Sequence, residues 1–140
     1  DWSSDVCSSD LINTVLFPLP SASRCHKLGQ AIGRAITAWE SDARVLVLGT
    51  GGLSHQLEGE RAGFLNKHFD LQFMDSLAAN PTWATQFSIN DLVKETGTQG
   101  IELLNWLTAR GAGASAARIC CRRGVSSLRR YWRCSKTTCG

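Results

Sequence analysis

The glycine-rich stretch GTGGLSH, residues 49–55, contains the residue type best suited to proton transfer. It directly follows the apolar run RVLVL, residues 44–48. Because glycine adopts positive φ without steric cost, Gly51 and Gly52 allow a sharp turn that holds His55 at the end of that run. A histidine side chain changes protonation near neutral pH and serves as a general base or acid. The pattern makes His55 a candidate catalytic residue.

The same glycines suggest a second interpretation, a phosphate-binding loop. Such a loop has the pattern GxxxxGK[ST] or GxGxxG and runs into a helix, so that backbone N–H groups converge on the anion. Here no Lys-Ser or Lys-Thr pair follows Gly49, Gly51 and Gly52, and the third glycine comes too early. The phosphate interpretation is therefore the weaker one.

Glu102 is the second residue of interest, because a carboxylate can bind a metal ion or accept a proton. It lies four residues before Trp106, at the edge of an apolar helical stripe that includes Leu103 and Leu107. Periodicity alone favours a solvated position on the helix surface. The residue types around Glu102 do not decide between these roles.

The other histidines and paired acids give weaker signals. His26 falls on the polar side of a predicted helix and His68 in a polar stretch, so both are predicted to lie on the surface. Asp70 and Asp75 are five residues apart, which is not the spacing of three or four that shares a helix face. These residues predict no metal site.

The elements that position His55 and Glu102 predict an α/β fold. A helix of about four turns is expected from Ser21 onward, capped by Ser21 or Ser23, with an apolar stripe of Leu28, Ile32, Ile36 and Trp39. Residues 45–48 are apolar without alternation, which is typical of a strand buried on both faces of a parallel sheet. We expect a fragment of a mainly parallel or mixed sheet flanked by helices, with ligands at the carboxyl ends of its strands.

Further helices are expected after the loop. Residues 69–77 are apolar-rich and precede the breaker Asn80-Pro81, and residues 89–94 fit another short helix. The last element is predicted from about Thr98 to Arg110, with Thr96 and Gln99 at the spacing of a capping box. Trp39, Trp83 and Trp106 are predicted to be core residues.

Charge and cysteine are distributed unevenly along the 140 residues, whose net charge is +3. Residues 113–140 hold seven basic residues and no acidic one, and five of the six cysteines lie in the two end segments. A single cysteine, Cys25, in the long middle segment favours a reducing, cytoplasmic setting over a disulfide scaffold. Neither a membrane-length apolar run nor a signal peptide is recognisable.

The end segments differ from the middle, which suggests three parts. Residues 1–11, DWSSDVCSSDL, resemble a translated sequencing adapter, and residues 113–140 are expected to be a frame-shifted or disordered tail. Residues 12–112 are expected to be the folded domain. The alternatives for the tail are a nucleic-acid arm with stacking aromatics and a zinc site made by four thiolates, although it has no CxxC pair.

The middle segment resembles a known enzyme family in three consecutive motifs. They are INTVLFPLPSASRCHKLGQAIGRAI, then VLVLGTGGLSHQLEGERAGFLNKHFDLQFMDSL, then PTWATQFSINDLVKETGTQGIELLNWLTARGA. Together they resemble the C-terminal half of class III extradiol ring-cleaving dioxygenases, of the type of the protocatechuate 4,5-dioxygenase β subunit and gallate dioxygenases. The resemblance covers nearly all of residues 12–112.

The resemblance implies roles for both candidate residues. The histidine of the GTGG-x-SHQ motif is the acid/base next to the metal, which corresponds to His55, and the glutamate of the GTQG-x-EL-x-NW motif is an iron ligand, which corresponds to Glu102. Two histidines from the N-terminal half complete the Fe(II) site in that family. The implied reaction opens a protocatechuate- or gallate-like catecholic acid with O2 to a muconic semialdehyde-type product.

The implied partners are the catecholic acid, O2, an accessory subunit and other copies in a homo- or hetero-oligomer, with no nucleic acid and no membrane. Because two iron ligands are not in this sequence, we expect the isolated chain to be inactive. The alternative is an unrelated α/β domain that carries a basic nucleic-acid-binding tail.

Overall fold

A computed structural model describes residues 12–113 of the chain. The described part is helical: α1 (Ala22–Ala38), α2 (Lys67–Ala79), α3 (Ile89–Thr96) and α4 (Leu103–Gly113) are joined by loops and by the short 3₁₀ helices η2 (Trp83–Gln86) and η3 (Gly100–Glu102). Apart from Gly113, the predicted end segments 1–11 and 113–140 lie outside the described residues, as do the nucleic-acid and zinc alternatives for the tail.

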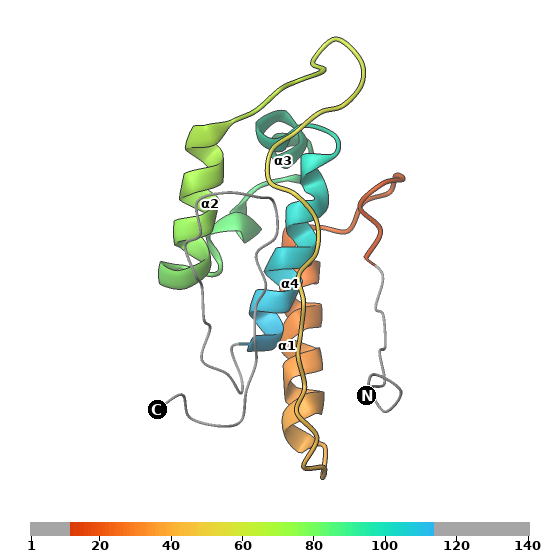
Figure 1. Cartoon of the computed structure of the whole chain (residues 1–140), viewed down its shortest axis with the longest axis vertical. Helices are drawn as coiled ribbons and strands as arrows, with labels where there is room; N and C mark the ends of the chain where they lie inside the picture. The colour runs from red at the N-terminus through yellow and green to blue at the C-terminus, as the bar shows by residue number, and fades with distance from the viewer. Residues whose placement is uncertain (1–11, 114–140) are drawn as a thin grey trace, which may run out of the picture.

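Helix α4 forms the centre of this arrangement. It packs along α1, while α2 lies on its other side and α3 lies beside its N-terminal end (Figure 1). Its side chains are buried around most of its circumference, which explains why its apolar residues are not confined to one stripe. The largest fully buried apolar side chains come from α2, α3, α4 and η3: they are Phe73, Leu77, Leu92, Ile101, Leu103, Leu104 and Leu107.

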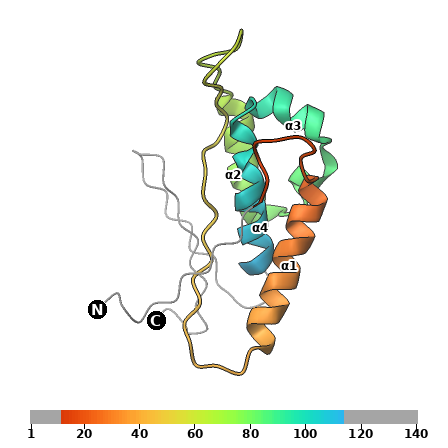
Figure 2. The same cartoon turned by 90° about the vertical axis from the view of Figure 1, so that its right-hand side faces the viewer.

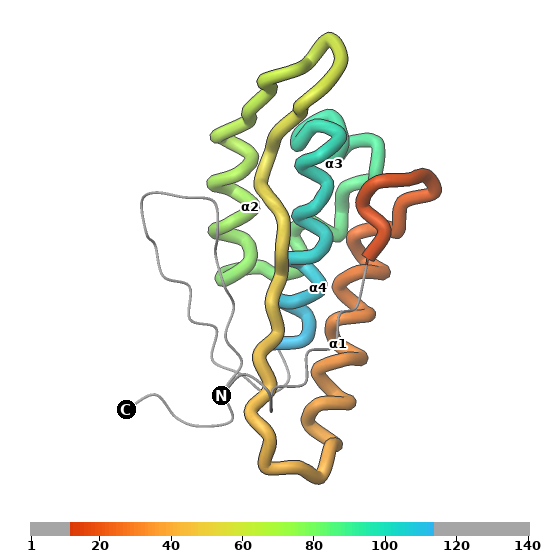
Figure 3. Tube along the Cα trace, turned by 45° about the vertical axis from the view of Figure 1, so that its right-hand side comes forward, coloured from red at the N-terminus to blue at the C-terminus, as the bar shows by residue number. Residues whose placement is uncertain are grey.

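The predicted α/β fold is wrong for the described residues, because residues 12–113 contain no strand. The run 44–48 is extended and passes along α4 without a neighbouring strand within residues 12–113 (Figures 2 and 3). Only one side of it is covered: Val45 and Val47 are half-buried, whereas Leu46 is 52% and Leu48 44% exposed. The apolar residues 45–48 do not alternate with polar ones, but this pattern did not indicate a segment buried on both faces, since single exposed leucines are common on protein surfaces.

The first helix forms where predicted, but it buries a different face. Ser21 is its N-cap and accepts a hydrogen bond from the backbone N–H of Arg24 at 3.3 Å. Leu28 and Trp39 of the predicted stripe are 47% and 55% exposed, so the prediction of Trp39 as core is wrong. The buried residues of α1 are instead small or polar: Ala22, Cys25, His26, Gly29 and Gly33.

Glycine determines this choice of face. A Cβ on Gly29 would lie 2.0 Å from the carbonyl oxygen of Thr108, and one on Gly33 would lie 2.4 Å from that of Ala112. On α4, a Cβ on Gly111 would lie 2.5 Å from the carbonyl oxygen of His26. The backbones of α1 and α4 therefore approach more closely than larger side chains would permit, and a leucine stripe could not face α4.

The remaining helix predictions are confirmed with shifted boundaries. Helix α2 covers the predicted 69–77 segment and ends at Asn80, and α3 covers the predicted 89–94 segment. The predicted capping box at Thr96 is wrong, because Thr96 ends α3 and its hydroxyl donates to the carbonyl of Leu92 at 2.7 Å. The last helix begins later than predicted and runs past Gly111.

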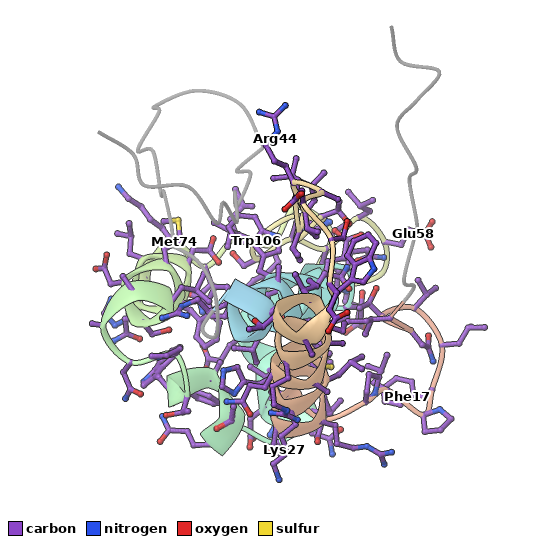
Figure 4. The ribbon with its side chains drawn as sticks, turned by 90° about the horizontal axis from the view of Figure 1, so that it is seen from below. Phe17, Lys27, Arg44, Glu58, Met74 and Trp106 are labelled. Atoms are coloured by element: carbon purple, nitrogen blue, oxygen red, sulfur yellow. The ribbon has the colours of Figure 1, made fainter. Side chains whose placement is uncertain are left out.

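The aromatic side chains divide between core and surface. Trp106 of α4 is 4% exposed, whereas Arg44 and Lys27 point outward from the molecule (Figure 4). Trp83 packs against the core with Phe69 and Phe87, its ring centroid 5.5 and 4.9 Å from theirs. No helix among residues 12–113 has the length and apolar character needed to span a bilayer.

Candidate active site

The glycine turn after the extended run lies directly against the start of α4. A Cβ on Gly49 would be 2.8 Å from the Cα of Trp106, so the backbone at position 49 can touch the helix only because it carries no side chain. Two residues later the indole N–H of Trp106 donates to the carbonyl of Gly51 at 3.2 Å. Gly51 has φ +110°, a conformation that favours glycine. Trp106 thus anchors the turn to α4.

Glu102 holds the same turn from the adjacent helical turn. It is the last residue of η3 and is half-buried. Its Oε2 accepts the backbone N–H of Gly52 at 2.7 Å, which is a short, charge-assisted bond. This bond leaves Oε1 as the carboxylate oxygen that could bind a cation. Glu102 is therefore not the solvated surface residue that helical periodicity alone favours.

His55 is fixed through its backbone by the segment between α3 and α4. Its N–H donates to the carbonyl of Thr96 at 2.8 Å, and its carbonyl accepts the N–H of Gly100 at 3.1 Å. Gly97, with φ +81°, passes so close that a Cβ there would lie 2.4 Å from the carbonyl oxygen of His55. Residues far apart in sequence thus clamp this histidine.

The ring of His55 has a defined tautomer. Its Nδ1 lies 2.7 Å from the carbonyl oxygen of Leu53. Because a carbonyl oxygen can only accept, Nδ1 must carry the hydrogen, and in the neutral ring Nε2 then has the free lone pair. Nε2 is therefore the atom that can take a proton from a substrate.

His55 and Glu102 converge on one point above Gly52. A Cβ built on Gly52 would be 2.9 Å from Cε1 of His55 and 3.8 Å from Oε2 of Glu102. On Gly51 it would be 2.6 Å from the Cβ of Glu102. Both glycines are thus needed to leave the space that the imidazole and the carboxylate share. The structure brings together the two residues that the sequence singled out.

The phosphate-loop interpretation does not fit this geometry. No helix begins within residues 53–66, and the next helix starts at Lys67. The N–H of Gly52, which such a loop would offer to an anion, is bound by the carboxylate of Glu102.

The described residues do not form a complete metal site. Residues 12–113 contain no group of three or more His, Cys, Asp or Glu side chains placed to hold an ion. Glu102 offers one carboxylate oxygen that could bind an ion, and His55 uses one ring nitrogen for the carbonyl of Leu53. The two other histidines lie elsewhere: His68 is exposed on α2, as predicted, whereas His26 is only 6% exposed between α1 and α4, contrary to the surface position predicted for it.

The polar residues that follow His55 bind the loop rather than the site. Gln56 donates to the carbonyl of Glu58 at 2.9 Å, and Arg61 donates to the carbonyl of Lys94 at 2.8 Å. Asn66 caps α2 by accepting the N–H of Phe69 at 3.1 Å.

Sequence reasoning missed a hydrogen-bonded pair next to His55, formed by the buried Ser54 and the half-buried Asp70. The carboxylate of Asp70 accepts both the backbone N–H and the hydroxyl of Ser54, which lies 16 residues earlier in the chain. The only local signal was Asn66 at N-cap spacing, which places Asp70 in the first turn of α2.

The comparisons with known proteins point to one family. The family described as the catalytic LigB subunit of aromatic ring-opening dioxygenase matches residues 10–138. A gallate dioxygenase of Pseudomonas putida is 41% identical over 100 residues, which are 71% of this chain and 29% of that protein.

Two further relatives carry a different substrate in their names. A 2,3-dihydroxyphenylpropionate/2,3-dihydroxicinnamic acid 1,2-dioxygenase of Xanthobacter autotrophicus is 30% identical over 88% of this chain and 51% of its own length. One of Klebsiella pneumoniae is 51% identical over 45 residues, which are 32% of this chain and 14% of that protein. The chain thus spans between about a third and a half of the two longest matches.

Proposed function

The chain belongs to the family of LigB-type catalytic subunits of aromatic ring-opening dioxygenases, and from this premise we propose that it contributes His55 and Glu102 to an extradiol ring-cleaving site. The proposed reaction uses O2 to open a catecholic aromatic acid, protocatechuate- or gallate-like, to a muconic semialdehyde-type product. The observation that carries this proposal is the convergence of the imidazole and the carboxylate above Gly52. The family match also excludes the alternative of an unrelated domain.

Glu102 is proposed as the one carboxylate ligand of an Fe(II) ion. Its charge, its half-buried position and its bond to the N–H of Gly52 fit a ligand held in place by its surroundings. Because residues 12–113 offer no three-ligand group, the site also needs two histidines from outside them. A bound Fe(II) with two histidines and one carboxylate would supply Lewis acidity and open positions for the catecholate and O2.

His55 is proposed as the acid/base. Its Nε2 would take the proton of a catechol hydroxyl, because Nδ1 is occupied by Leu53, and would later return a proton to the ring-opened product. The backbone bonds to Thr96 and Gly100 hold residue 55 in place, so that the ring is already positioned for this proton transfer. Trp106 serves the site by anchoring Gly51, and not as a platform for the substrate ring.

We include a cytoplasmic setting and assembly with other subunits in this proposal. Cys25, a buried free thiol, supports a reducing compartment. The assembly is included because the resemblance to the family implies it.

The experiment that tests the proposal is a chimaera. The 100 matched residues of the Pseudomonas putida gallate dioxygenase are replaced by the corresponding residues of this chain, and iron content and ring opening of gallate and protocatechuate are measured. We expect an active, iron-containing chimaera, and we expect Glu102→Gln to lose both iron and activity. The exposed Glu58→Gln is the matched control and should retain both. An active chimaera whose Glu102→Gln variant still binds iron and turns over would contradict the role of Glu102.

A further inference from the structure

The polar network beside His55 connects the site to α2. Ser54 is 3% exposed, and both of its donors point to one carboxylate: its N–H donates to Oδ1 of Asp70 at 2.9 Å and its hydroxyl to Oδ2 at 2.8 Å. The same hydroxyl oxygen accepts the N–H of Asn66 at 2.7 Å. The backbone N–H and the hydroxyl of Ser54 are therefore all engaged in hydrogen bonds with Asp70 and Asn66.

Asn66 extends the network to α3. Its side-chain amide donates to the carbonyl of Glu95 at 3.1 Å and to Oε2 of the same residue at 2.8 Å. Its side-chain oxygen accepts the N–H of Phe69. The two ends of the loop 54–66 are thus tied to each other and to both helices, so that Ser54 cannot move independently of them.

Ser54 lies between the two partners of the bond that sets the tautomer of His55. The Nδ1 contact spans from the ring of residue 55 to the carbonyl of residue 53, and its length depends on the φ and ψ angles of Ser54. On the far side, His55 is held by Thr96 and Gly100. With one side clamped, the backbone of Ser54 decides whether the carbonyl of Leu53 stays in reach of the ring.

We propose that Asp70 is a positioning residue for His55. By holding Ser54 with both carboxylate oxygens, it keeps the carbonyl of Leu53 against Nδ1 and so leaves Nε2 as the basic nitrogen. Asp70 acts through Ser54 and makes no hydrogen bond or ion pair with the imidazole or with Glu102 among the described residues. The inference rests on the proposed function only where it gives Nε2 a catalytic use, because the tautomer is a property of the folded chain.

The test is the tautomer of His55 in the full 140-residue chain, read from the ring ¹⁵N resonances of the histidine-labelled protein. The spectra are recorded at about pH 8, well above the ordinary histidine pKa of about 6.5. His55→Gln assigns the signals among the three histidines. We expect Nδ1 of the wild type to give a protonated-nitrogen resonance and Nε2 an unprotonated one.

Asp70→Asn is the decisive variant, because it keeps the shape of the side chain but cannot accept both bonds from Ser54. We expect the two ring resonances of His55 to move toward each other as the Nε2–H tautomer becomes populated. The matched control is Asp91→Asn, which also removes an acid from the first turn of a helix, α3, but on an exposed side chain. The control should leave the His55 resonances unchanged.

A folded Asp70→Asn chain with the wild-type His55 resonances would overturn the proposal. If this variant loses its helical circular dichroism, Ser54→Ala decides instead, because it removes only the hydroxyl bonds. We expect it to shift the resonances part of the way, and wild-type resonances in folded Ser54→Ala would equally overturn the proposal. Ring cleavage does not enter this readout, so failure of the proposed function in the chimaera leaves the result interpretable.

Discussion

At the scale of single residues, Gly52 controls the space between the side chains of His55 and Glu102. We predict that Gly52→Ala in the chimaera lowers the rate of ring opening by about a hundredfold, because the added methyl would lie 2.9 Å from Cε1 of His55 and would displace the ring. Iron content should change little. The measurement is kcat at saturating substrate, with iron determined on the same sample.

Gly63→Ala is the control for this substitution. It lies in the same loop with φ +82° and nothing within 4 Å, so it strains the backbone without entering the site. It should lower stability but keep the rate. Equal rates for the Gly52 and Gly63 variants would show that the space above Gly52 is not needed.

His26 gives the folded chain a predicted dependence on pH. Burial, and secondarily the charge of Arg110, lower the pKa of His26 below its ordinary value of 6.5, and its Nε2 is buried without a hydrogen-bond partner among the described residues. Below pH 6.5 the unfolded chain therefore binds more protons at this position than the folded chain. The free energy of unfolding should fall as pH decreases through this window, by at most about 1.4 kcal/mol per pH unit.

The measurement is the urea midpoint between about pH 5 and pH 7.5, for the wild type and His26→Gln. Glutamine cannot titrate, so the variant should show a shallower decrease than the wild type. A matched exposed residue, His68→Gln, should keep the wild-type slope. Identical slopes for wild type and His26→Gln would contradict the buried, neutral state of His26.

The residues of the site were predictable to different degrees. His55 and Glu102 could be identified because each belongs to a motif that resembles a known family. Their proximity could not be derived from spacing, since the bond between Gly52 and Glu102 spans 50 residues. The cap at Asn66 could place Asp70 in the first turn of a helix, but nothing in the sequence indicated its bond to Ser54, which lies 16 residues away.

At the scale of elements, the contact between α1 and α4 depends on glycine. We predict that Gly29→Ala destabilises the chain by about 2 kcal/mol, although alanine favours a helix by about 1 kcal/mol in an unhindered position. The steric term outweighs helix propensity because the added Cβ would lie 2.0 Å from a backbone oxygen, which can move only if α4 moves.

Chemical denaturation measures this effect. Arg34→Ala, at an exposed position of the same helix, is the control and should change the free energy of unfolding by less than about 0.5 kcal/mol. A Gly29→Ala chain as stable as the wild type would contradict the close approach of the two helices.

Helix positions were predictable from the sequence, whereas their buried faces were not. Capping residues and breakers such as Ser21 and Asn80 act locally, so they indicate helix ends without knowledge of the fold. Which face of α1 is buried depends on the surface of α4 that it packs against, and that surface consists of backbone and small side chains. The prediction of a strand at residues 44–48 was wrong for a related reason. An extended run becomes a strand only when another extended segment pairs with it, and in the described part residues 44–48 lie between helices.

At the scale of the whole molecule, the described residues form only part of the proposed site. The 3₁₀ helix η3 carries Glu102 directly before α4, Trp106 of α4 anchors the glycine turn, and the loop tied to α2 and α3 presents His55. The chain matches 29% of the length of the gallate dioxygenase. The family was predictable from three motifs in order, while the boundaries at residues 11 and 113 stay predictions.

The most direct test of this account is the ring-opening rate of the chimaera with His55→Gln, compared with His68→Gln. If Nε2 of His55 transfers the proton, His55→Gln should retain iron but lose between about a hundredfold and ten-thousandfold in kcat. His68→Gln replaces an exposed histidine on α2 and should match the unsubstituted chimaera. A His55→Gln chimaera as active as His68→Gln would contradict the central claim that His55 and Glu102 form one catalytic site.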